Sequence, residues 1–257
     1  MWERVTAMLR AAEGPVSRFP PTVLYNENWM LRLVLDWLVE RRMSSLIQVT
    51  PNSTWYSEAL LPSAFLPRWR GDTLGESYTH ADGVVGQFEI GGSGKGDLVL
   101  SPEATQLSVI EGKMFSRLSK GVKNARYFDQ AARNAACVAE VLRARQLKPQ
   151  GMEALSFCVV APEAQIAKGV FEDLVTKESI ERKVRARVAE YEGEKDAWFE
   201  DWFLPTLAEM KLALVGWEAL LAEVAADDAT VGGQLADFYQ SCVRFNSPPT
   251  RAVVDSS

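Results

Sequence analysis

Histidine is almost absent from this sequence, whose 257 residues include only His80. A zinc hydrolase, an HNH nuclease or a site that exchanges protons between two histidines needs more than one such side chain. Those classes are therefore excluded, and we expect any chemistry to use carboxylates, lysine or a hydroxyl group. His80 lies in the segment YTHADG, which reads as an exposed loop.

Cysteines and long apolar runs are scarce as well. The three cysteines are far apart and lie among apolar residues, which is typical of buried thiols in a reducing compartment (Cys137, Cys158, Cys242). No window approaches 18 uncharged apolar residues, so we expect no membrane span. The first 14 residues contain charged side chains and no apolar core, so we expect no secretory signal. Together these features predict a cytoplasmic protein without a disulfide framework.

The rest of the composition is ordinary for a globular chain, with 47% hydrophobic and 24% charged residues. Hydrophobic periodicity and turn residues predict an α/β protein. The expected core elements are, in order, a helix, three strands of an antiparallel meander, a helix and a strand buried on both faces (22–42, 83–90, 96–100, 106–114, 123–146 and 155–161).

The expected organisation has three parts. Residues 1–162 form the core, 163–245 form a helical region packed on it, and 246–257 form a flexible tail. The stretch 50–80 is rich in Pro, Ser and Trp, so we expect an irregular connection there with a short helix at 56–61. The helical region is also a candidate surface for a homodimer.

Charged residues interrupt the predicted strands where apolar side chains are expected. Side chains alternate between the two faces of a strand, so Glu111 and Lys113 project from the same face. Asp97 opens the preceding predicted strand and would lie across from them in a hairpin. Two carboxylates supply oxygen ligands for Mg²⁺ or Mn²⁺, and a lysine can orient a water or stabilise developing negative charge. This set suits phosphodiester hydrolysis.

Asp97 followed by Glu111-Gly112-Lys113 resembles the D…(D/E)xK signature of the PD-(D/E)xK nuclease superfamily, which includes many restriction endonucleases. The order of the predicted elements from 22 to 161 also resembles the core of that family. The resemblance implies a restriction-endonuclease-like fold and a metal-dependent nuclease. In it Asp97 and Glu111 hold the metal, and both act with Lys113 in catalysis.

The resemblance also implies roles for two residues on the predicted helices. Glu27 matches the acidic residue that many members carry on the first core helix as a further metal ligand. Gln130 matches a glutamine that contacts substrate in some members. The sequence departs from the family at two places, since Asn134 replaces a common tyrosine and Gly96 replaces the proline of the motif.

Positive charge gathers next to the predicted site. Residues 113–148 contain nine basic and two acidic residues, a net charge of +7, although the whole chain carries −6. Such a strip suits a phosphate backbone. We therefore expect substrate contacts from four of its basic side chains (Arg117, Lys120, Lys123, Arg126).

These observations predict a Mg²⁺- or Mn²⁺-dependent nuclease whose partner is nucleic acid, most simply a DNA endonuclease. The alternative is a catalytically silent nuclease-fold subunit that binds DNA or acts as a scaffold, and RNA is an open alternative substrate. Glu111 and Lys113 could instead form a solvated ion pair on an edge strand, and Glu27 could simply favour a helix start. Three further acids could also reach the site (Glu76, Asp82, Glu89).

Overall fold

The computed structural model describes residues 1–15, 17–42, 44–91, 96–121 and 125–247. Its helices are α1 to α9, two short 3-10 helices, η1 and η2, and one π-helical turn, η3. Their bounds follow in chain order (α1 Trp2–Arg10, η1 Pro21–Val23, α2 Glu27–Arg41, α3 Gln130–Arg145, η2 Pro149–Gly151, α4 Glu163–Ala167, α5 Lys177–Ala189, α6 Asp196–Trp198, η3 Phe199–Phe203, α7 Leu204–Glu209, α8 Trp217–Asp227, α9 Ala229–Asn246). Its strands are β1 to β7 (β1 Thr54–Leu61, β2 Thr79–Gly86, β3 Phe88–Ile90, β4 Leu98–Leu100, β5 Gln106–Gly112, β6 Ala154–Ala161, β7 Lys211–Gly216).

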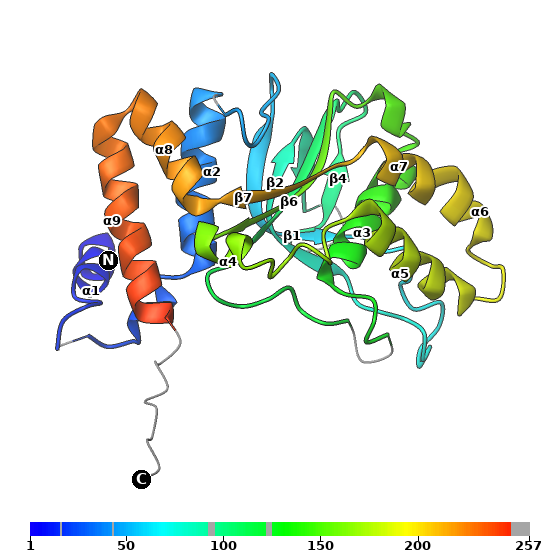
Figure 1. Cartoon of the computed structure of the whole chain (residues 1–257), viewed down its shortest axis with the longest axis horizontal. Coiled ribbons are helices and arrows are strands. Elements are labelled where there is room, and N and C mark those ends of the chain that lie inside the picture. The colour runs from blue at the N-terminus through cyan, green and yellow to red at the C-terminus, as the bar shows by residue number, and fades with distance from the viewer. Residues whose placement is uncertain (16, 43, 92–95, 122–124, 248–257) are drawn as a thin grey trace, which may run out of the picture.

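A mixed five-stranded sheet forms the middle layer, in the order β1-β2-β5-β6-β7. The pairs β1–β2 and β2–β5 are antiparallel, whereas β5–β6 and β6–β7 are parallel. One apolar core packs α3 and α5 against one face of the sheet, and a second packs α2, α8 and α9 against the other. Figure 1 shows the resulting three layers, and the prediction of an α/β protein is confirmed.

Local chemistry explains where the two core helices begin and end. Asn26 caps α2 by accepting a hydrogen bond from the backbone N–H of Trp29, and Asp129 caps α3 in the same way. Each helix ends at a residue in the left-handed region, Arg42 and Gln146. The predicted helices 22–42 and 123–146 therefore exist but begin five and seven residues later than expected.

The meander consists of different strands from those predicted. Residues 54–61, expected to be irregular and partly helical, form the edge strand β1, where Trp and Tyr favour a half-buried extended chain. Its neighbour β2 begins at Thr79, and the predicted strand 96–100 is β4, which pairs with β3 in a separate two-stranded sheet. The three antiparallel strands of the central sheet are thus β1, β2 and β5, with the β3–β4 hairpin inserted between the last two.

The region after residue 163 is not entirely helical, contrary to the prediction for 163–245. Residues 211–216 form β7, which pairs in parallel with β6 and extends the central sheet. The prediction of helix fails here because a short apolar run fits a buried strand as well as a buried helix. Since β7 belongs to the sheet, the region is continuous with the core. The predicted tail 246–257 lies outside the described residues from 248 onward.

Close packing between β2 and β5 depends on one glycine. A Cβ atom on Gly86 would lie 2.2 Å from the carbonyl oxygen of Gln106. No other residue fits that approach without moving the backbone. Gly86 therefore helps to bring β2 beside β5, the pairing on which the site described below depends. None of the described helices is long and apolar enough to cross a membrane.

Candidate active site

Glu111 stands at the centre of a polar cluster at the end of β5. It is fully buried, and its carboxylate accepts hydrogen bonds from Lys113 Nζ at 2.5 Å and from Gln130 Nε2. Asn134 Nδ2 lies 3.4 Å from its other oxygen. Because a buried carboxylate is costly unless it is paired and hydrogen-bonded, these contacts offset part of the cost of burying Glu111 there.

A second carboxylate, that of Asp82 on β2, lies beside Glu111. One residue beyond the pair Gly83–Ile110, the antiparallel register brings Asp82 next to Glu111. Asp82 Oδ2 accepts a hydrogen bond from the backbone N–H of Gly112 at 3.0 Å and lies 3.8 Å from Lys113 Nζ. Lys113 therefore contacts both carboxylates.

The surroundings of Glu111 change its pKa. Burial raises the pKa of Glu111 well above its ordinary value, and the negative charge of Asp82 raises it further. The ammonium group of Lys113 opposes both effects. A pair of neighbouring carboxylates with one lysine has more negative than positive charge when both acids are ionised, and it is an environment that favours an added cation.

Asp97, predicted to complete this site, lies elsewhere. It precedes β4 and forms an isolated bridge with Leu60, and the backbone N–H of Leu60 donates to Gly96 O at 2.7 Å. The central sheet places β1 and β2 between this position and β5. The prediction that Asp97 faces Glu111 across a hairpin is therefore wrong, because β4, the strand that Asp97 precedes, pairs with β3 and not with β5.

Glu27 lies near the end of β5, where Glu111 and Lys113 are located. It is the first residue of α2, and its Cβ would be 3.6 Å from a Cβ built on Gly112, between Glu111 and Lys113. The small size of Gly112 leaves room for this approach of α2 to β5. The structure thus brings Glu27 to the neighbourhood of the two acids, and its role as a metal ligand remains a prediction.

Gln130, the first residue of α3, is brought to the site as predicted. Its Nε2 donates to Glu111, while its Oε1 accepts a hydrogen bond from the backbone N–H of Ser119 at 3.1 Å. The side chain therefore ties the loop after β5 to the buried carboxylate. Asn134 lies one helical turn further along, and its Oδ1 is buried without a hydrogen-bond partner.

The predicted basic contacts lie on the segment that joins β5 to α3. Arg117, Lys120 and Arg126 are exposed there, so their charges are available to a ligand. Lys123, the fourth predicted contact, lies outside the described residues. Lys183 on α5 pairs with Asp129 at 2.7 Å and fixes the start of α3 against the helical layer.

The other acids considered from the sequence have different surroundings. Glu76 is buried and lies 3.8 Å from Arg133, which makes it part of the packing between α3 and the loop before β2. Glu89 on β3 is exposed and pairs through its backbone with Val99. Of the three, Asp82 is the one that joins the site.

Sequence reasoning missed Glu58, which lies opposite Asp82 between the pairs Ser57–Gly83 and Ala59–Ala81 of the β1–β2 ladder. Its backbone has φ 59°, an uncommon conformation for a non-glycine residue in a strand. Its carboxylate accepts a hydrogen bond from Asn28 Nδ2 at 2.9 Å and lies 3.9 Å from Nδ1 of His80, whose side chain is exposed. The only signal in the sequence is an acid in an aromatic, alternating segment, which indicates a strand but no partner.

The donor set fits a hard divalent cation such as Mg²⁺. Within the described residues, no group of three His, Cys, Asp or Glu side chains is arranged as a complete metal site. Mg²⁺ does not need one, since it commonly binds one or two carboxylates and takes its remaining ligands from waters and substrate phosphates. Asp82 and Glu111 would supply those two carboxylates.

Compared with models of protein families, with curated proteins and with solved structures, the chain finds no match. Arguments about its function therefore depend on the site itself.

Proposed function

We propose that this protein is a metal-dependent nuclease that hydrolyses phosphodiester bonds in DNA. One observation carries the proposal: Asp82 and Glu111 lie side by side on antiparallel strands, and Lys113 contacts both. The element order α2-β1-β2-β5-α3-β6 supports a restriction-endonuclease-like core. In that arrangement Asp82, in place of Asp97, is the aspartate on the second strand of the meander, and Glu111-Gly112-Lys113 ends the third.

Asp82 and Glu111 would hold the cation, with Glu27 beside them. When bound, Mg²⁺ lowers the pKa of a coordinated water and neutralises charge on the phosphate. Lys113 is placed to hold the attacking water or to stabilise negative charge as the phosphorus–oxygen bond breaks. Gln130 fixes the orientation of the Glu111 carboxylate, as hydrogen-bonding partners do for ligands in other metal sites.

The exposed bases Arg117, Lys120 and Arg126 support nucleic acid as the substrate. They follow β5 directly in the sequence, so a phosphate backbone bound along this segment would continue toward Lys113. Such contacts position a strand without reading its sequence. Two alternatives are tested against this proposal: RNA as the substrate, and a catalytically silent subunit that binds DNA.

The test is hydrolysis of supercoiled plasmid by the purified full-length chain with Mg²⁺ or Mn²⁺. We expect cleavage that stops in EDTA and falls at least about 10³-fold in Glu111→Gln and Lys113→Met. The matched controls are Glu103→Gln and Lys168→Met, because both side chains are exposed outside the site. DNA binding without cleavage by the wild type would identify a silent subunit, and cleavage of RNA alone would reassign the substrate.

A further inference from the structure

The two edges of the central sheet, β1 and β7, are protected to different degrees. The outer edge of β1 is covered at Leu60, whose backbone N–H donates to Gly96 O at 2.7 Å and which bridges to Asp97. Two residues earlier, Glu58 has φ 59° and interrupts the regular strand. Proteins protect their edge strands by such covers and irregularities, which prevent pairing with another chain.

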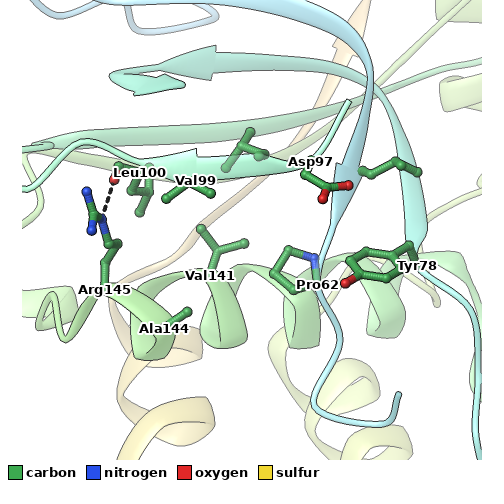
Figure 2. Close-up of a pocket in the computed structure, with 10 residues that line it drawn as sticks. Pro62, Tyr78, Asp97, Val99, Leu100, Val141, Ala144 and Arg145 are labelled. Atoms are coloured by element: carbon green, nitrogen blue, oxygen red, sulfur yellow. Dashed lines mark hydrogen bonds between the residues drawn. The ribbon is translucent and has the colours of Figure 1, made fainter. Parts of the chain in front are cut away.

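The segment that covers β1 is held in place by α3. Asp97 leads into β4, and Arg145 Nε donates to the carbonyl oxygen of Leu100, the last residue of that strand, at 2.6 Å. Figure 2 shows this bond, with Val99 on β4 and Val141 on α3 lining the cavity between the two elements. The cover over β1 is therefore a fixed part of the fold.

The other edge strand, β7, has no comparable cover. Its three residues after the first are half-buried, whereas its neighbour β6 is almost entirely buried (Leu212, Ala213, Leu214). Within the described part of the chain, residues 211–215 form no backbone hydrogen bond other than those to β6. None of these residues is a proline, and none has a positive φ. A regular, apolar and open edge is a template for a further strand.

The two ends of β7 differ in charge. Its start is surrounded by two lysines and a glutamate, and its end by two glutamates (Lys177, Glu209 and Lys211; Glu163 and Glu218). An antiparallel neighbour with the same sequence would bring the start of each strand beside the end of the other, and so lysines beside glutamates. A parallel neighbour would bring the two acidic ends together. The charges therefore favour an antiparallel copy of the same strand.

We propose that β7 pairs antiparallel with β7 of a second copy of this chain, about a twofold axis at Ala213, and so joins the two five-stranded sheets. In this register Leu212 lies opposite Leu214 of the second copy on the α3 side of the sheet, and the two small Ala213 side chains face each other on the α8 side. The assembly closes at two copies, because β1 is covered and only β7 is open to the second chain.

The mass of the purified full-length chain in EDTA, without nucleic acid, is the first test. Analytical ultracentrifugation should give the mass of two chains of 28.6 kDa. Lys211→Glu should weaken association about tenfold, because it brings like charges together at both ends of the strand pair. Arg10→Glu is the matched control, since α1 lies beside α9 and away from β7 (Figure 1). A monomeric wild type, or equal association in Lys211→Glu and the wild type, would overturn the proposal.

A cysteine placed on the axis tests the register. Opposite Cα atoms in an antiparallel pair are about 4.5–5.5 Å apart, a separation that a disulfide can span. Mild oxidation should therefore link two Ala213→Cys chains, whereas Lys211→Cys, which lies opposite Val215 of the second copy, should stay unlinked. The natural cysteines are buried and should not react (Cys137, Cys158, Cys242).

Thermal unfolding curves check that both cysteine variants are folded. Linkage of Lys211→Cys alone, or a dimer in which Ala213→Cys stays unlinked, would place the interface elsewhere and overturn the proposal. Because these measurements contain neither metal nor nucleic acid, their outcome is independent of whether the chain cleaves DNA.

Discussion

The pair formed by β2 and β5 and the hairpin formed by β3 and β4 each carry an aspartate next to glycine and apolar residues. Asp82 precedes Gly83-Val84-Val85, and Asp97 follows Gly96 and precedes Leu98-Val99. Asp82 lies beside Glu111 and Lys113, whereas Asp97 lies by β1 and an apolar cavity. Similar local sequences thus reach different chemical surroundings because the strand that each one pairs with is different.

The largest expected effect separates these two aspartates. Asp82→Asn should lower plasmid hydrolysis with Mg²⁺ at least about 10³-fold, because it removes a charged metal ligand. Asp97→Asn should change the rate at most about threefold, since β1 and β2 separate it from Glu111. Initial cleavage rates on one plasmid preparation measure both. A larger loss in Asp97→Asn than in Asp82→Asn would reverse the assignment.

The second effect concerns metal binding in the absence of nucleic acid. At a Mn²⁺ concentration of 100 times its Kd, the native protein should gain about 2.7 kcal/mol of stability, which raises Tm by about 5–10 °C for a chain of this size. Asp82→Asn should lose this gain, and Asp97→Asn should keep it. Differential scanning fluorimetry with and without EDTA shows the difference, and an equal shift in both variants would exclude Asp82 as a ligand.

A smaller effect is expected at Gln130, which hydrogen-bonds Glu111 without being a ligand in the proposal. Gln130→Ala should reduce kcat about tenfold, in the lower range for residues that orient metal ligands. Gln150→Ala is the matched control, since Gln150 is exposed in η2. Single-turnover cleavage measures both variants, and an unchanged rate in Gln130→Ala would limit that side chain to holding the loop at Ser119.

The smallest effects should come from the exposed bases. Arg117→Ala, Lys120→Ala and Arg126→Ala should each weaken DNA binding about threefold. Each should also reduce the slope of log affinity against log salt concentration by a little under one unit. Arg4→Ala on α1 is the control, because α1 lies next to α9 on the far side of the sheet (Figure 1). Binding titrations between 50 and 200 mM salt measure this slope. If it is the same in all variants, this segment makes no phosphate contacts.

Much of the site could be predicted from the sequence, but not its second carboxylate. Alternation along the predicted strand 106–114 places Glu111 and Lys113 on one face, and in the structure Lys113 Nζ does donate to Glu111, with Gln130 at the start of α3 beside them. The predicted meander omits β1 and therefore begins one strand too late, so its second strand is the segment of Asp97 instead of β2 with Asp82. Prolines and polar residues around 50–80 are typical of a loop, so the local sequence does not indicate β1. Its side chains become partly buried only because β2 pairs with it.

The sequence by itself determined the α/β class, the lack of histidines for catalysis, and the strand that carries Glu111 and leads to Lys113, because all of these follow from composition and from the two-residue period of a strand. Tertiary structure alone decided which aspartate meets them. Pairing of β2 with β5 depends on contacts between distant segments, including the close approach at Gly86. No local pattern records which segment becomes the neighbour of β5, and so only the folded sheet distinguishes Asp82 from Asp97.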